Sequence, residues 1–341
     1  MAAFTSKDVA RLARVSQSTV SYVMSGKRPI SDETRRRVLD AIDHLTYEPN
    51  AGARALASQR TNVVGLVVPF GRGADTTGLL PFIETIAGAA RARDHDVLLV
   101  TTDEGAAGIR RLAGRSMCDA IILMDLHARD DDRLPVAAEV RTPVILIGVP
   151  DDPHGLHCVD LDFALAARLA VDELAACGHD RLALVGHPAE IVHRDLNYVN
   201  RFYDAARRTA HGHGLPLEVI APVEWGREAA GVAADRLVAL ADGHRLGVVI
   251  PASNTVQPIV HALTARGLAP GRDVSVIGLC TDLSAAEGEP PVTNVSLEPR
   301  DVSRRAMETL FRLLDSPVAR PPTIELITPE LTRRQTVMPP P

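Results

Sequence analysis

Aromatic residues are scarce in this sequence, and long hydrophobic runs are absent. Phe, Trp and Tyr make up 3% of the 341 residues, although 46% are hydrophobic. The apolar content is therefore mostly Ala, Val, Leu and Ile, as in the buried strands of α/β proteins. No apolar stretch approaches the ~18 residues of a membrane-spanning helix, and the N-terminus lacks the apolar segment of a secretory signal. We therefore expect a cytoplasmic protein that has no membrane partner.

Several motifs of enzymes and metalloproteins are also missing. The four cysteines are isolated from one another, which favours reduced thiols over disulfides or a zinc site. The segment Gly71–Gly73 is not extended into a GxGxxG or GxxxxGK[ST] motif, and there is no GxSxG. Histidines near 154–158 and 211–213 have spacings and neighbours typical of loops rather than of metal ligands. We expect no enzymatic activity, no cofactor and no metal site.

Charge is distributed unevenly along the chain. The net charge is −6, but residues 1–60 carry ten Lys and Arg against six Asp and Glu. The first 60 residues therefore have a charge of +4 and the remainder −10. A basic N-terminal segment on an acidic body favours contact between that segment and a polyanion.

The first 49 residues contain the signals of three short helices. Thr5 and Asp8 fit a capping box, Ser16 can cap a second helix that runs to about Met24, and Ser31 opens a third. Apolar residues recur at helical spacing in each segment. Two short helices joined by a tight turn and braced by a third predict a helix-turn-helix domain.

In a helix-turn-helix domain the second helix enters the major groove of DNA with its N-terminal residues at the base edges. Candidate base contacts are Gln17, Ser18, Ser21 and Tyr22. Hydroxyls and helix N-termini bind phosphates without sequence preference. Candidate phosphate contacts are Thr5, Ser16, Thr19, Ser31, Thr34, Tyr47 and Asn50. The alternative is that these hydroxyls are ordinary solvated helix caps.

After the first 49 residues, which we call the head, the sequence pattern changes twice. Asn50–Arg60 is rich in Ala and too short to form a stable helix alone. Buried-strand runs then alternate with helical stretches such as Pro81–Arg93, Ala164–Cys177 and Asn254–Arg266, which predicts parallel sheets with right-handed crossovers. The runs are Val63–Val68, Val97–Val100, Ala120–Met124, Val144–Ile147, Leu182–Val185, Gly247–Ile250 and Val274–Ile277. Their number favours two lobes over one sheet.

The head and the body together resemble the LacI/GalR (lactose-repressor) family. In the head, the residues that carry the resemblance are Lys7–Ala10, Val15–Ser21, Ser31-x-x-Thr34-Arg35 and Leu45-x-Tyr47-x-Pro49-Asn50-x-x-Ala53-x-x-Leu56. In the body they are Asp160, Cys177–Gly186, Ser253-Asn254, Gly271–Gly278, Pro290–Val295 and Pro329-x-Leu331-x-x-Arg333-Arg334. The resemblance covers essentially the whole chain.

The resemblance implies an all-α helix-turn-helix head at 1–49, a hinge helix or linker at 50–60, and a type I periplasmic-binding-protein-like α/β core at 61–337. The core would have two doubly wound lobes linked by three crossover strands. Lobe 1 would comprise about 61–164 and 294–320, and lobe 2 about 165–293 and 321–337. In the hinge, Leu56 would be inserted into the minor groove of DNA, with Ala53, Arg54 and Ala57 beside it.

The function implied is that of an effector-responsive repressor that binds a palindromic operator in double-stranded DNA as a homodimer. A solute-binding or sugar-processing protein with an incidental helical head is the alternative. The effector, a sugar or another metabolite, would lie in the inter-lobe cleft. Candidate effector contacts are Phe70, Arg72, Asp75, Asp125, Gly148, Arg194, Tyr198, Trp225, Asn254 and Cys280.

The cleft positions depart from the family pattern. Tyr198 stands where an effector-binding Arg is usual, Arg201 where Gly is usual, and Cys280 where a hydroxyl-binding Asp is usual. Arg194, four residues before Tyr198, can substitute for the missing Arg, and Trp225 fits either a ring platform or simple packing. These losses predict an effector with fewer hydroxyls than a hexose, or a sugar held by other groups.

Overall fold

The computed structural model describes residues 4–25, 28–47, 60–70, 76–220, 226–316 and 321–340. The chain divides into two compact units, Met1–Asn62 and Val63–Pro341. Most of the predicted hinge, 50–60, lies outside the described residues. Among the helices described, none has the length and apolar character needed to cross a bilayer.

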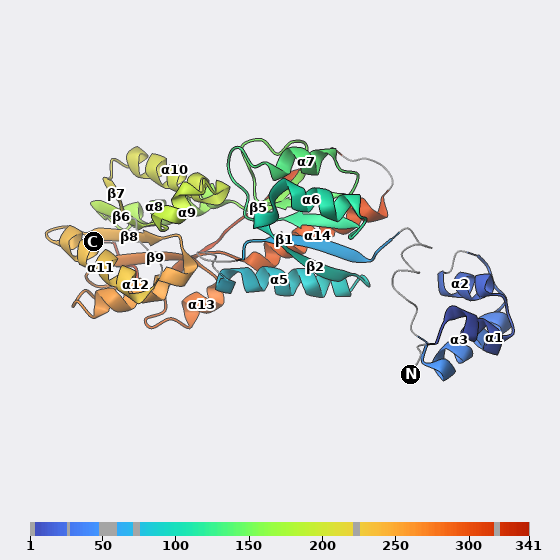
Figure 1. The fold of residues 1–341 in the computed structure, drawn as a ribbon. Helices are drawn as coiled ribbons and strands as arrows, with labels where there is room; N and C mark the ends of the chain where they lie inside the picture. Colours follow the sequence, from blue (N-terminus) through green and yellow to red (C-terminus); the bar gives the residue numbers. More distant parts are fainter. Residues whose placement is uncertain are drawn as a thin grey trace. The chain divides into compact units, whose positions relative to one another are not determined.

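The first unit is a three-helix head. Its helices are α1 (Ser6–Ala13), α2 (Gln17–Ser25) and α3 (Asp32–Leu45) (Figure 1). Apolar side chains from all three helices form its core: Val9, Ala10, Ala13, Val20, Val23, Val38 and Ala41. The three predicted helices are confirmed, because the caps and the apolar spacing that define them are local features of the sequence.

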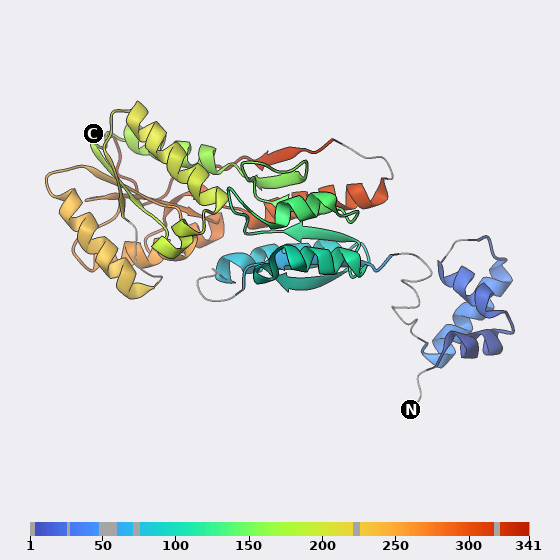
Figure 2. The same ribbon diagram turned by 45° about the horizontal axis from the view of Figure 1, so that its top comes forward.

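The larger unit contains two lobes, each with a six-stranded sheet. In lobe 1 every neighbouring pair of strands is parallel. The order is β11 (Ile324–Ile327), β5 (His157–Leu161), β4 (Val144–Ile147), β3 (Ala120–Leu123), β1 (Val63–Val68), β2 (Asp96–Thr101). One face is covered by α5 (Thr76–Arg91) and α14 (Pro299–Asp315), and the other by α6 (Gly105–Gly114) and α7 (Arg133–Glu139) (Figures 1 and 2). A short helical turn, η1 (Thr102–Glu104), precedes α6.

Strand residues in lobe 1 alternate between these two faces. Val64 and Leu66 pack in the core beneath α5 and α14, whereas Val67 packs in the core beneath α6 and α7. Both faces of a parallel sheet are therefore apolar, which explains the continuous hydrophobic runs in the sequence.

Lobe 2 repeats the doubly wound plan with one antiparallel edge strand, β12 (Leu331–Thr332). The order from that edge is β12, β10 (Thr293–Ser296), β9 (Ser275–Cys280), β8 (Leu246–Ile250), β6 (Arg181–Val185), β7 (Leu217–Ile220). Helices α8 (Phe163–Ala176) and α10 (Asn197–Gly212) pack on one face, and α11 (Arg227–Ala241) and α12 (Val256–Thr264) on the other. Shorter helices are α9 (Ala189–His193), η2 (Ser253–Thr255) and α13 (Asp282–Ala286).

Within the described part of the chain, three segments connect the lobes: after β5, after β10, and between β11 and β12. Three crossovers were predicted, but the predicted lobe boundaries were wrong in two places. Residues 294–296 were assigned to lobe 1, yet they belong to β10, which pairs with β9 of lobe 2. Conversely, Ile324–Ile327 was assigned to lobe 2 but pairs with β5 of lobe 1. Strand pairing between distant segments decides which sheet a late strand joins, and local patterning carries no such information.

Candidate nucleic-acid interface and ligand cleft

Helix α2 presents a row of polar side chains on the surface of the head. Gln17, Ser18 and Ser21 are exposed, and Tyr22 is half-buried. The Gln17 Nε2 amide donates a hydrogen bond of 2.7 Å to Ser6 Oγ at the start of α1. This bond orients the amide and leaves its carbonyl oxygen and second N–H for a base edge. The predicted base contacts therefore lie together on one short helix.

Tyr22 contacts a residue that the sequence did not single out. The Arg28 guanidinium lies over the Tyr22 ring at 5.1 Å from its centroid. Such a cation–π contact contributes roughly 0.5–1 kcal/mol at an exposed site and restricts the ring. Arg28 belongs to the turn predicted after α2. A basic residue in that turn was the signal that could have identified it as a neighbour of Tyr22.

The predicted phosphate contacts first serve the helices to which they belong. Ser16 Oγ accepts a hydrogen bond from the Thr19 N–H at 3.1 Å and lies 2.7 Å from Ser18 Oγ. Ser31 Oγ accepts from the Thr34 N–H at 3.4 Å and so caps α3. The Thr5 hydroxyl donates to Asp8 at 2.7 Å.

Helix caps and phosphate contacts are compatible, because the first turn of a helix keeps N–H groups that have no partner within the helix. The Tyr47 ring packs at the edge of the head core, which limits it to contacts through its exposed part. Asn50, Ala53, Arg54, Leu56 and Ala57 lie outside the described residues.

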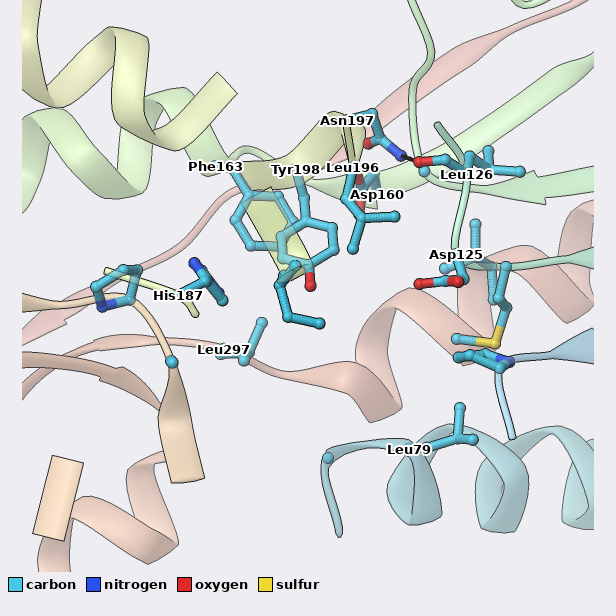
Figure 3. Close-up of a pocket in the computed structure, with 18 of the residues that line it drawn as sticks. Leu79, Asp125, Leu126, Asp160, Phe163, His187, Leu196, Asn197, Tyr198 and Leu297 are labelled. Carbon is cyan, nitrogen blue, oxygen red and sulfur yellow. Dashed lines mark hydrogen bonds between the residues drawn. The ribbon is translucent and has the colours of Figure 1, made fainter. Parts of the chain in front are cut away.

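The larger unit contains a cavity of about 210 Å³ between its lobes. Carboxyl ends of strands from both sheets meet there, which is where open α/β sheets bind ligands. The cavity is lined by Pro69, Gly78, Leu79, Phe82, Met124, Asp125, Leu126, Ile147, Gly148, Asp160, Phe163, His187, Ile191, Arg194, Leu196, Asn197, Tyr198, Pro251, Ala252, Ser253, Asn254 and Leu297. Figure 3 shows side chains from both lobes pointing into this space.

Half of the predicted effector contacts lie in this lining. They are Asp125, Gly148, Arg194, Tyr198 and Asn254. Phe70 is not among the residues that line the cavity: the residue is 44% exposed, and the preceding Pro69 lines the cavity instead. Arg72, Asp75 and Trp225 lie outside the described residues.

Cys280 was also predicted to line the cleft, and this was wrong. Its side chain is 2% exposed and packs in the core between the lobe 2 sheet and its α11–α12 layer. Strand alternation in β9 turns it to that face, and burial raises the pKa of its thiol to about 12.

Ion pairs connect the lobes around the cleft. Arg194 of lobe 2 donates to Asp125, which follows β3 of lobe 1, and Arg201 on α10 donates to Asp160 on β5. Arg129 of lobe 1 pairs with Asp195 at 3.1 Å. The charged residues of the segment 194–201 are thus bonded to lobe 1.

Asn197 and Gly148 complete this contact between lobes. The Asn197 Nδ2 donates to the Leu126 carbonyl at 2.9 Å, and its Oδ1 accepts from the Val149 N–H at 3.3 Å. Gly148 has φ +131°, and a Cβ there would lie 3.0 Å from Asn197 Nδ2. Only glycine suits this backbone conformation and this close approach.

Burial changes the ionisation of two cleft residues in opposite directions. Desolvation raises the pKa of Asp160 to about 6 despite its pairing with Arg201. Desolvation lowers the pKa of His187 to about 4, so this imidazole is neutral at pH 7. The backbone N–H of His187 donates to the Tyr203 hydroxyl at 2.6 Å.

Aromatic rings form one wall of the cleft. Phe163 and Tyr198 have ring centroids 5.3 Å apart, and the His187 ring lies edge-on to Tyr198 at 5.9 Å (Figure 3). Sequence reasoning missed Phe163, His187, Asn197 and Leu297 as cleft residues. His187 directly follows the strand entry that had been identified, so its place after a strand was a usable signal. Among the described residues, no group of three or more His, Cys, Asp or Glu could hold a metal ion.

A helix-turn-helix head joined to a two-lobed α/β unit with a cleft at its strand ends defines the class: a DNA-binding head on a periplasmic-binding-like core. Two family models match the corresponding parts of the chain. Residues 5–50 match bacterial regulatory proteins of the lacI family, and residues 171–337 match the periplasmic binding protein-like domain. The chain therefore carries a DNA-binding domain of the lacI family and a periplasmic-binding-like core, and the relatives that match most of its length are transcriptional regulators.

Similar proteins include relatives that match almost the whole chain and others that match about half of it. Catabolite control protein A of Priestia megaterium is 27% identical over 318 residues, covering 90% of this chain and 92% of that protein. Catabolite control protein A of Streptococcus mutans is 38% identical over 184 residues, covering 53% of this chain and 54% of that protein. The lac repressor dimer bound to operator and the anti-inducer ONPF matches in fold, with a TM-score of 0.81 at 20% identity over 99% of this chain and 100% of that one.

Proposed function

We propose that this regulator is an effector-responsive repressor that acts in the cytoplasm and binds palindromic operator DNA as a homodimer. The observation that carries the proposal is the presence, in one chain, of an exposed polar helix on a helix-turn-helix head and a separate cleft between two lobes. The similar lac repressor structure is a dimer bound to operator, and the similar CelR structure is a complex with cellobiose. Both likenesses support the proposal.

On the DNA side, Gln17 and Ser18 read base edges in the major groove. Gln pairs bidentately with adenine, and Ser bonds several bases. The Tyr22 ring contacts a thymine methyl, and its contact with Arg28 keeps it in place. The hydroxyls at the starts of α2 and α3 bind phosphates. Leu56 of the hinge acts as the wedge in the minor groove, with Ala53, Arg54 and Ala57 beside it.

On the effector side, a ligand in the cleft contacts both lobes and changes the free energy of their closure. Residues 50–60 couple that change to the head, because a helix of this length is too short to be stable alone. A small change in lobe closure can therefore order or melt it. The coupling is reciprocal, so operator DNA changes effector affinity by the same factor as the effector changes operator affinity.

Fluorescence anisotropy with a labelled palindromic fragment from the DNA upstream of the gene tests the DNA side. We expect binding that falls steeply between about 50 and 200 mM salt, as phosphate contacts require, and that is weaker on a scrambled fragment. Gln17→Ala should reduce the preference for the palindrome. Arg236→Gln on the exposed face of α11 is the matched control and should leave it unchanged.

Equal affinity for the palindrome and the scrambled fragment would contradict a sequence-specific regulator. It would favour a solute-binding or sugar-processing role for the core.

A further inference from the structure

The charged side chains in the described lining of the cleft are already paired within the protein. They are Asp125, Asp160 and Arg194. Arg194 binds Asp125, and Arg201 binds Asp160, each pair joining the two lobes. A ligand ion would find each of these charges already engaged, and to gain an opposite charge it would have to break a pair; an anion that took Arg194 or Arg201 would leave Asp125 or Asp160, both largely buried, without its partner. That is costly, because an uncompensated buried charge is strongly destabilising.

Most of the remaining lining is apolar. Phe163 and Tyr198 form a wall of packed rings, and Leu79 is drawn across the space from them (Figure 3). Leu297 also lines the cavity. His187 next to this wall is neutral at pH 7 because burial lowers its pKa to about 4. A flat ring suits such a surface, because offset and edge-on aromatic pairs stabilise beyond the area they bury.

Uncharged hydrogen-bonding side chains in the described lining are few. They are His187, Asn197, Tyr198, Ser253 and Asn254. Asn197 is engaged with the lobe 1 backbone through both ends of its amide. A molecule with a hydroxyl on every carbon would have to draw most of its hydrogen bonds from the paired charges and from the backbone, and each group left unsatisfied opposes binding.

We propose that the cleft takes an uncharged molecule built on one apolar ring, preferably aromatic, with only a few hydrogen-bonding groups at its edge. The cavity of about 210 Å³ is smaller than the ~300–1,000 Å³ of sites for drug-sized ligands, which limits the ligand to a small ring compound. That this molecule is the effector rests on the proposed function. The ligand class rests on the cleft alone.

Isothermal titration calorimetry on the full chain tests this with four probes of similar size: benzyl alcohol, benzoate, benzylammonium and D-xylose. We expect benzyl alcohol to bind about tenfold or more tightly than each of the others. Tyr198→Ala should weaken benzyl alcohol binding about tenfold. That factor corresponds to the upper end of the energy of one aromatic contact. Tightest binding of xylose or of either ion, or no binding of benzyl alcohol at millimolar concentration, would overturn the proposal.

Two charge variants test the reason for the selectivity. Asp125→Asn leaves Arg194 without its partner and should shift the preference toward benzoate, whereas Arg194→Gln should shift it toward benzylammonium. Arg266→Gln removes a surface ion pair with Asp235 of 2.5 Å and is the matched control, with no expected shift. An unchanged order of probes in both folded cleft variants would show that the paired charges do not set selectivity.

Operator binding by the ligand-free chain, measured in parallel, separates the two proposals. Preference for a charged or polyhydroxylated probe, together with intact sequence-specific DNA binding, refutes only the ligand class. Absence of sequence-specific DNA binding, together with the expected preference for benzyl alcohol, refutes only the repressor.

Discussion

The head and the cleft place their polar side chains in opposite environments. In the head, polar side chains such as Gln17, Ser18 and Ser21 are exposed and come from one short helix. In the cleft, Asp125 and Asp160 are largely buried and meet arginines of the other lobe, far away in the sequence. An exposed polar group is solvated until DNA arrives, whereas a buried one needs its partner from the moment of folding.

This difference predicts where substitutions act. Changes in the head surface should alter DNA recognition with little effect on stability. Changes at the cleft pairs should alter stability and ligand selectivity together.

The largest effect is expected at the Arg201–Asp160 pair. Arg201→Met leaves Asp160 buried without its partner and should lower the free energy of unfolding by about 3 kcal/mol. Arg236→Met removes an exposed pair with Glu218 of 2.7 Å and should cost less than ~1 kcal/mol. Urea unfolding followed by circular dichroism measures both. Equal losses in the two variants would mean that burial of the cleft pair is unimportant.

The pH dependence of stability should separate Asp160 from His187. Burial raises the pKa of Asp160 from 3.8 to about 6, so the folded chain binds this proton more tightly than the unfolded chain. The resulting stabilisation is fully present below pH 3.8 and is lost as the pH rises through 6. His187 has a lowered pKa of about 4, so its contribution is complete above 6.5 and is lost as pH falls toward 4. When the pH falls from about 7.5 to 4.5, Asp160 should raise the free energy of unfolding by ~2 kcal/mol and His187 should lower it by ~2 kcal/mol.

Thermal and urea unfolding across that range provide the measurement. Relative to the unmodified chain, Asp160→Asn should make acidification more destabilising, and His187→Gln should make it less so. Parallel pH profiles for all three proteins would show that neither group titrates as its burial requires.

In the head, Tyr22→Arg should change the operator preference at one base pair of each half-site. Arg pairs with guanine, whereas Tyr contacts a thymine methyl, and each base contact of this kind discriminates by about 1–3 kcal/mol. Binding to a set of half-site variants measures the change, with unfolding free energy as the control. If the preference at that base pair stays the same, Tyr22 serves only as a packing partner of Arg28.

The smallest effect is expected at a helix cap. Ser31→Ala removes the acceptor of the Thr34 N–H and should destabilise the head by ~1 kcal/mol. Ser21→Ala, on the exposed face of α2, is the matched control and should change stability by less than half of that. Both are measured by thermal unfolding. A larger loss for Ser21→Ala would place that hydroxyl in the packing of the head.

Sequence patterns predicted the fold well where the information is local. The three helices of the head followed from caps and apolar spacing, and all seven predicted core strands are present with small shifts at their ends. Strand β5 was missed because polar His157 and Asp160 interrupt its apolar residues. Strand β11 was missed and its lobe mistaken because its pairing with β5 spans more than half of the larger unit.

The cleft was predictable only in part, for a similar reason. Asp125 and Gly148 follow neighbouring strands of the lobe 1 sheet, so parallel sheet geometry was enough to bring them together. Asn254 follows β8 of lobe 2 and lines the same cavity only because the two lobes pack together. The sequence could not show that Arg194 and Arg201 would be engaged by Asp125 and Asp160, since those pairs form between lobes. Nor could it show that alternation in β9 turns Cys280 into the core.

Local patterns in the sequence specify the helix-turn-helix head and the alternating α/β core, because caps, hydrophobic period and motif spacing act over a few residues. Tertiary structure decided which lobe each late strand joins and which cleft residues remain open to a ligand. Those outcomes depend on contacts between distant segments, where burial requires charges to find partners and thereby sets the chemistry of the cleft.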